Sequence, residues 1–374
     1  MALLGAASAL AGPVERAQAK RMHDRLAGVP ASEAVLDQME SLIVSGQVTQ
    51  AARIAMQAKT FYTTTLKNFV TPWTNEEQSV FAPLNDYTAT VIGMVRDDVD
   101  YRQVLSGDIL YVGGSGLPAY SPTNNNLYQQ MEDQDVDLSS SSVLVASTQS
   151  AHTGLPAPAT AGVITTRAAA QAFFEAGTNR AMFRFTMMNH MCKDMEQVHD
   201  VNLPPDRIRQ DVSRSPGGDS RLFLNGCIGC HNGMDPLTQA FAFYNYNETS
   251  GAMEYTPGQV QPKYLINQDN FKPGYVTKDE GWSNYWRSGA NTVLGWDSSL
   301  PGSGVGAKSM GTELAHSDQF ARCAVEKVFK TVCLHPAANS ADRNKVNDII
   351  NVFRGGGYKM KDVFAETAAY CKGN

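Results

Sequence analysis

The residues with the clearest chemical purpose are the two thiols and the histidine of the stretch Cys227-Ile-Gly-Cys230-His231. Two thiols separated by two residues, with a histidine directly after the second, are what covalent haem attachment requires, because each thiol can add to one haem vinyl group. The histidine then lies beneath the iron as its proximal ligand. The motif occurs once in the sequence. We therefore expect one covalent haem c, held by Cys227, Cys230 and His231.

Two other uses of this cysteine pair fit the sequence less well. A structural zinc site needs four ligands, and the chain has neither a second C-x-x-C nor an H-x-x-x-H. A thioredoxin-like dithiol would need a βαβ context, which the surrounding sequence lacks. Haem attachment remains the preferred interpretation.

The residues around the motif suggest how the chain approaches the porphyrin. Gly226 and Gly229 have no side chain, so the backbone can press against the porphyrin edge. Asp235-Pro236 has the form of a helix N-cap followed by proline at the first helical position. We therefore predict a haem loop followed by a helix over 236–246, with strands near 252–255 and 263–266 beyond it.

The sixth iron ligand decides the function. A methionine or histidine there gives a closed iron suited to electron transfer, whereas an open position admits peroxide or oxygen. Met310 lies C-terminal to the motif, at the end of a glycine-rich loop over 288–311 and before a helix predicted from Thr312. Met310 is therefore the expected distal ligand, with His190, His316, Met253 or an open site as alternatives.

The four remaining cysteines are Cys192, Cys323, Cys333 and Cys371. An even remainder in a chain whose haem chemistry implies an oxidising compartment predicts disulfides. Cys323 and Cys333 lie on one predicted helix, where about 15 Å would separate them, too far for a bridge. We therefore expect Cys192 to pair with one of these two and Cys371 with the other, with four buried free thiols as the alternative.

The composition restricts the class of protein. The chain has 374 residues, of which 43% are hydrophobic, and a net charge of -6. This length can bury a sizeable core, and an acidic chain without a basic cluster argues against nucleic-acid binding. Residues 1–19 contain an apolar run ending in small residues, which is too short for a membrane span and is interpreted as a signal-peptide remnant. No other stretch is a transmembrane candidate.

Hydrophobic periodicity predicts a mainly α-helical fold with a few short strands in loops. We expect an N-terminal helical domain over 1–110, a loop-rich connection over 111–162 with one strand at 143–146, and a monohaem cytochrome c-like domain over 163–374. The N-terminal domain should contain a helix opened by Ser32, a second over 48–69, and a third over 80–95 capped near Thr74. Helices over 312–332, 341–353 and 359–369 should end the chain.

Several segments resemble the planctomycete-type cytochrome domains. The haem motif runs into Asp235-Pro-Leu237 and then Phe241-Ala-Phe243, as in the haem-binding domain of that family. The segments 320–329 and 357–363 resemble the domain that follows it, while 161–166 and 95–105 resemble the domains that precede it. The resemblance implies an exported bacterial protein with Cys227 and Cys230 as attachment thiols and His231 as proximal ligand. Thr238 departs from the family pattern, in which glycine is common at that place.

Together these features predict an exported monohaem c-type cytochrome that carries single electrons to a redox partner protein in the periplasm or at the cell surface. One alternative is a haem peroxidase or oxygenase with an open distal pocket lined by His190 and the methionines at 187, 191 and 195. Another is a haem-bearing structural subunit of an oligomer or surface assembly, suggested by the long loop over 111–162.

Overall fold

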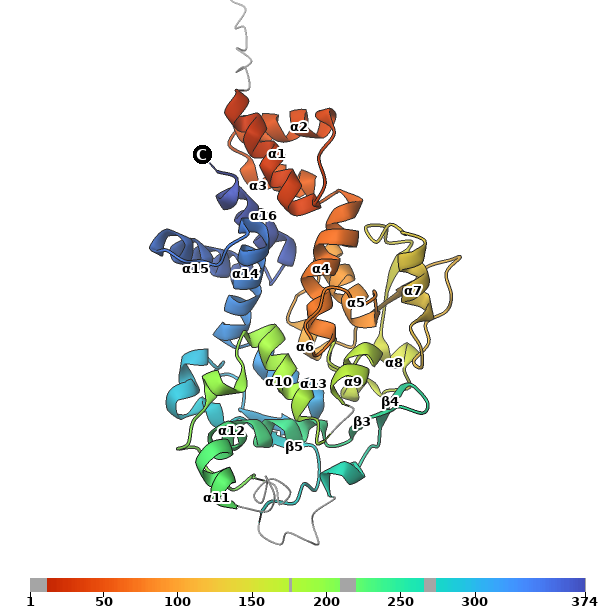
Figure 1. Ribbon diagram of the computed structural model, residues 1–374, viewed down its shortest axis with the longest axis vertical. Coiled ribbons are helices and arrows are strands. Elements are labelled where there is room, and N and C mark those ends of the chain that lie inside the picture. Colours follow the sequence, from red (N-terminus) through yellow and green to blue (C-terminus); the bar gives the residue numbers. More distant parts are fainter. Residues whose placement is uncertain (1–11, 175–176, 209–219, 266–273, 374) are drawn as a thin grey trace, which may run out of the picture.

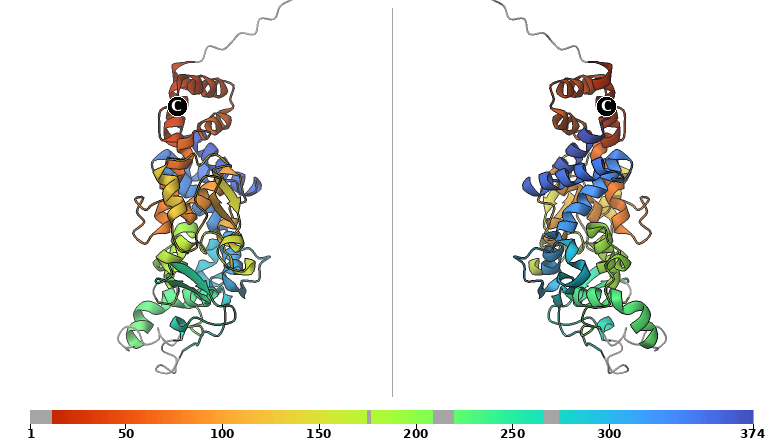
Figure 2. Two further views of the ribbon diagram at one scale, coloured as in Figure 1. Left: turned by 90° about the vertical axis from the view of Figure 1, so that its right-hand side faces the viewer. Right: turned by 90° about the vertical axis from the view of Figure 1, so that its left-hand side faces the viewer.

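The computed structural model describes residues 12–174, 177–208, 220–265 and 274–373. Within these ranges the protein is mainly helical, as predicted, and its strands form small two-stranded sheets. The molecule is elongated, with the first three helices at one end and the haem-motif helix near the other (Figure 1). The same order of segments along the long axis is visible from both sides (Figure 2).

The helices of the first half of the chain are α1 Pro13–Ala27, α2 Glu33–Val44, α3 Val48–Ala55, α4 Lys67–Val70, α5 Asp86–Arg96, α6 Gln103–Ser106, α7 Asn126–Asp133, α8 Gln149–His152, α9 Arg167–Phe173 and α10 Arg180–Thr186. Those of the second half are α11 Ser220–Leu222, α12 Ile228–Thr238, α13 Gly306–Ala315, α14 Asp318–Cys333, α15 Ser340–Gly355 and α16 Met360–Cys371. The strands are β1 Leu110–Gly113, β2 Leu144–Ser147, β3 Tyr244–Asn247, β4 Ala252–Tyr255, β5 Gly281–Ser283 and β6 Ser303–Val305.

Local capping explains where several helices begin. Ser32 is the N-cap of α2 and its hydroxyl accepts the backbone N–H of Val35, as the sequence predicted. The third N-terminal helix starts later than predicted, because Asn85 rather than Thr74 is its cap and accepts the N–H of Thr88. Residues 75–85 instead form an irregular loop.

The segment 111–162 contains more regular structure than predicted. The expected strand is present as β2, and it pairs antiparallel with β1, so that Leu110 lies opposite Ser147. Helices α7 and α8 also lie within this segment. Tyr128 of α7 is buried and donates a hydrogen bond to the carbonyl of Tyr111, which ties the segment to the core.

One large cluster of buried side chains extends from α1 to α16 and includes residues from all three predicted domains. The three-part division of the chain stays a prediction. The predicted C-terminal helices are present, except that the first is divided at His316 and Ser317 into α13 and α14. In the parts that the structure describes, no helix combines the length and apolarity needed to cross a membrane. Residues 1–11 lie outside the described residues, and 13–19 form the first half of α1.

Candidate haem-binding site

Helix α12 carries the whole attachment motif. A short π-helix over Phe223–Cys227 leads into it, and Cys227 occupies its N-cap position. The prediction of a loop followed by a helix from Pro236 was wrong, since α12 runs from Ile228 through Pro236 to Thr238, and β3 follows where the helix was expected to continue. The physical reason lies in Asp235, whose carboxylate binds other side chains instead of capping a new helix.

His231 is oriented by Asp235, one helical turn further along α12. Its Nδ1 lies 3.0 Å from the Asp235 Oδ1. Because an ionised carboxylate can only accept, the imidazole proton is placed on Nδ1, and Nε2 keeps its lone pair. In the described parts of the chain, Nε2 has no hydrogen-bond partner. The histidine side chain is 16% exposed, and the Phe223 ring lies 5.4 Å away between centroids. His231 therefore has the tautomer and the free nitrogen that an iron ligand needs.

The Asp235 carboxylate is itself held by a cation. It is completely buried and accepts a hydrogen bond from the Arg180 Nε at 2.9 Å. Burial would raise the pKa of this carboxyl, but the charge of Arg180 and the hydrogen bonds from Arg180 and His231 outweigh burial and hold the pKa well below its usual range. The resulting chain of contacts, from Arg180 through Asp235 to His231, fixes both the position and the charge of the group behind the imidazole.

The two motif cysteines are the free thiols of the protein, and both are half-buried. Cys227 packs against a small apolar cluster formed by Ile208 and Phe223. The thiol of Cys230 donates to the carbonyl of Met195 at 3.5 Å. Burial raises the pKa of the Cys230 thiol, and the carboxylate of Glu196 adds to this effect. Both thiols lie within one turn of the helix that carries His231, as attachment to one porphyrin edge requires.

The glycines of the motif region serve packing within the protein. A Cβ on Gly229 would lie 2.2 Å from the Nε2 of His199, and one on Gly233 would lie 1.9 Å from the Nε1 of Trp286. Gly229 and Gly233 thus let one face of α12 approach these two rings. A Cβ on Gly226 would have nothing within 4 Å among the described atoms. We expected glycine at position 229 because it lets the backbone approach a porphyrin edge. The close contact with His199 is a second explanation for a glycine there.

The other four cysteines form two disulfides, Cys192–Cys323 and Cys333–Cys371. Cys323 and Cys333 both lie on α14 and do not pair with each other, which confirms the prediction from helix geometry. The bridges tie α14 at one end to the segment after α10 and at the other end to α16.

Met310 occupies a different setting from the one predicted. Helix α13 begins at Gly306, so Met310 lies inside a helix and not at the end of a loop. Its side chain is fully buried in the main core. The neighbouring Gly311 packs so closely on α6 that a Cβ would lie 1.8 Å from the carbonyl oxygen of Leu105. Met310 as distal ligand stays a prediction.

The alternative ligands have partners of their own. His190 is buried, its Nε2 lies 2.8 Å from the Tyr87 hydroxyl, and burial with the nearby Lys327 charge lowers its pKa to about 3. The Nδ1 of His316 donates a hydrogen bond to the carbonyl oxygen of Thr312 at 2.8 Å. Met253 is half-buried on β4 opposite Tyr246. The methionines at 187, 191 and 195 are buried in the core.

Two site residues were not identified from the sequence, namely Asp235 as a partner of His231 and Arg180 as a partner of Asp235. The spacing of four between His231 and Asp235 could have revealed the first, because such residues share a helix face. Arg180 lies on α10, far away in the sequence, and only the packing of α10 on α12 brings it to the site.

The residues present fit a covalently attached haem. Two free thiols on one helical turn, an adjacent histidine whose Nε2 has no partner among the described residues, and a carboxylate behind that histidine form a complete set of attachment and proximal groups. Groups of three or more histidine, cysteine or acidic residues that could hold a metal ion are absent from the described residues. No protein-family model, curated protein or solved structure matches this chain.

Proposed function

We propose that this protein is an exported monohaem c-type cytochrome that carries single electrons. The observation that carries the proposal is the division of the cysteines. Four of them are consumed in disulfides, while the two that remain free are the pair in the attachment motif beside His231. In an oxidising compartment, a pair of thiols held on one helical turn would oxidise to a disulfide unless another covalent bond used both of them, and addition to the two haem vinyl groups is such a bond.

The chain's own residues have defined roles in this proposal. Cys227 and Cys230 would bind the haem covalently, and His231 would coordinate the iron through Nε2. The haem would supply a one-electron couple. Asp235 would orient the imidazole and raise its basicity by accepting the Nδ1 proton, and Arg180 would keep Asp235 ionised.

The compartment and the partner follow from the same features. The two disulfides support a periplasmic or cell-surface location. The net charge of -6 favours a redox partner protein with a basic docking face.

Covalent haem is tested by intact mass and by acid-acetone extraction, after expression with a haem-attachment system. We expect one haem per chain that resists extraction. Cys227→Ser and Cys230→Ser should each weaken attachment, and the double variant should abolish it. A matched control is Cys192→Ser with Cys323→Ser, which removes a disulfide and should leave the attached haem in place. Wild-type protein without covalent haem would contradict the proposal.

The sixth ligand is tested with the reduced protein and carbon monoxide. If Met310 binds the iron, the spectrum of the wild-type protein should not change on addition of carbon monoxide, and Met310→Leu should make it change. Met131→Leu, a substitution of an equally buried methionine on α7, is the control. An immediate response of the wild-type protein would remove Met310 from its expected role.

A haem enzyme with an open distal site is the second candidate, and the Asp235 contact is compatible with it as well. A carboxylate behind the proximal histidine increases electron donation to the iron, which would assist peroxide or oxygen chemistry as well as set a potential. Turnover with peroxide, together with a carbon monoxide response in the wild-type protein, would select this candidate over the electron carrier.

A further inference from the structure

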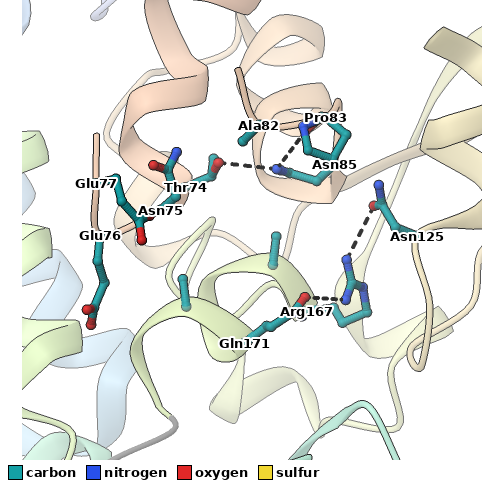
Figure 3. Close-up of a pocket in the computed structure, with 12 residues that line it drawn as sticks. Thr74, Asn75, Glu76, Glu77, Ala82, Pro83, Asn85, Asn125, Arg167 and Gln171 are labelled. Atoms are coloured by element: carbon teal, nitrogen blue, oxygen red, sulfur yellow. Dashed lines mark hydrogen bonds between the residues drawn. The ribbon is translucent and has the colours of Figure 1, made fainter. Parts of the chain in front are cut away.

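A groove with a volume of about 620 Å³ lies between the loop after α4, the start of α7 and helix α9. Its volume is in the range of small-molecule sites, which are typically about 300 to 1,000 Å³. Figure 3 shows Arg167 and Gln171 on one side, facing the stretch that contains Thr74, Pro83 and Asn85 on the other. The groove shares no lining residue with α12.

Arg167 is the unusual residue of this groove. Arg167 is only 8% exposed, yet the hydrogen-bond partners of its guanidinium are two neutral side-chain amides. One Nη donates to the Gln171 Oε1 at 2.9 Å, and the other donates to the Asn125 Oδ1 at 3.3 Å. Among the residues that the structure describes, no carboxylate forms an ion pair with it. Asp86 lies nearby but accepts the backbone N–H groups of Arg167 and Ala168.

A buried guanidinium without a counter-ion is costly, because buried charges are normally paired. Two amide oxygens satisfy part of its donor capacity, and no carboxylate of the described residues bonds to the guanidinium directly. Since Arg167 lines an open groove, an anionic group of a ligand can reach it. A carboxylate suits this position because its two oxygens match the planar fork of a guanidinium.

The remaining lining groups limit the rest of the ligand. The amides of Asn75 and Asn85 are already hydrogen-bonded within the protein. Glu76 and Glu77 are exposed at the rim and can only accept hydrogen bonds when ionised. Two rim carboxylates disfavour a multiply charged anion such as phosphate, and they favour a ligand that also carries a donor group.

We propose that this groove binds a small organic carboxylate that also bears a hydrogen-bond donor, that is, a hydroxy acid or an amino acid. The carboxylate pairs with Arg167, and the hydroxyl or ammonium group points to the acidic rim. This binding activity is independent of the proposed haem chemistry, because none of its groups lies on the haem-motif helix.

The decisive variant is Gln171→Glu, which supplies an internal counter-ion. Gln171 already contacts Arg167 through its Oε1, and its amide nitrogen has no partner among the described residues, so the substitution breaks no contact. The new carboxylate should neutralise Arg167, raise the melting temperature of the unliganded protein and weaken ligand binding at least tenfold. Gln38→Glu, the same change on the exposed face of α2, is the matched control and should do neither. Arg167→Gln should also weaken binding at least tenfold.

Binding is measured by calorimetric titration of the full-length protein with lactate and gluconate as hydroxy acids, alanine and glutamine as amino acids, and glucose and phosphate as controls. The proposal expects one of the two acid classes to bind and the controls not to bind, and the class that binds identifies the donor. It is overturned if none of the four acids binds, if phosphate or glucose binds equally well, or if Gln171→Glu leaves both affinity and melting temperature unchanged.

Discussion

Asp235→Asn is the substitution that most directly tests the role of the group behind His231. Asparagine keeps the shape of the side chain and one acceptor oxygen, so the hydrogen bond from His231 Nδ1 can persist without its charge. Its amide would face the Arg180 Nη, which lies 3.4 Å from the Asp235 Oδ2. The guanidinium side chain is 22% exposed and can turn towards water. The fold should therefore survive, while the imidazole loses its anionic partner.

The magnitude follows from the two kinds of hydrogen bond. A hydrogen bond to a charged group contributes about 1.5 to 3 kcal/mol and one between neutral groups about 0.5 to 1.5 kcal/mol, so the change is about 1 kcal/mol. A more basic imidazole stabilises the oxidised iron more than the reduced iron, because the oxidised state has the higher positive charge. Loss of the carboxylate should therefore raise the one-electron reduction potential by up to about 40 mV, the value reached if the whole of this 1 kcal/mol acts on the oxidised state, given that a tenfold change corresponds to about 59 mV.

The assay is a spectroelectrochemical titration of the haem-loaded protein. Asp342→Asn is the control, because Asp342 is also a buried carboxylate beside a histidine, His335 at 3.9 Å, but lies on α15, away from α12 (Figure 1). Circular dichroism confirms that each variant is folded. An unchanged or lower potential in Asp235→Asn, with a folded protein, would refute the reasoning that the carboxylate tunes the iron.

Two further predictions concern stability. Burial, partly opposed by the hydrogen bond from Tyr255, raises the pKa of Glu280 from its ordinary value of 4.5 to about 7, so the folded protein holds a proton that the unfolded chain has lost. The free energy of unfolding should therefore fall by about 2 to 3 kcal/mol as pH rises from 4.5 through 7. In urea titrations, Glu280→Gln should remove most of that fall. The same dependence of the free energy of unfolding on pH in both proteins would contradict the raised pKa of Glu280. Gly233→Ala should lower the free energy of unfolding by about 1 to 3 kcal/mol, because the new Cβ would meet the buried ring of Trp286. At Gly226 a new Cβ would meet no described atom, so Gly226→Ala should leave the free energy of unfolding unchanged or raise it by about 0.5 kcal/mol. Thermal unfolding compares them, and similar losses at both positions would disprove the packing argument.

The sequence predicted best those elements that are defined by local signals. Ser32 caps α2 through its own hydroxyl, and the expected C-terminal helices over 341–353 and 359–369 lie within α15 and α16 to within two residues. The pairing of cysteines was narrowed correctly because it depended on a single helix, α14. These predictions needed no knowledge of distant contacts.

One error arose where a tertiary contact overrides a local signal. Asp235-Pro236 has the form of a helix start, but Arg180 and His231 bind the Asp235 carboxylate, and α12 continues through the proline. The contact between Arg180 and Asp235 cannot be read from residues that are neighbours in the sequence. The setting of Met310 was missed for a local reason: it was placed at the end of a glycine-rich loop, yet Gly306, with φ of 76°, already allows β6 to turn into α13. The attachment motif could be found in the sequence because its residues are adjacent. The role of Arg180 as a partner of Asp235 could be found only from the packed structure.

The disulfide between Cys192 and Cys323 has a consequence for the order of maturation. The two cysteines are 131 residues apart, and Cys227 and Cys230 lie between them. In the proposed exported protein, Cys192 would therefore meet two reactive thiols before its proper partner emerged, and exchange among neighbouring thiols is a general hazard. In the proposed haem protein, early attachment would convert both competitors into thioethers, which cannot exchange. Haem loading would then protect the correct pairing of Cys192, so a failure of attachment would lead to misfolding through the wrong disulfide.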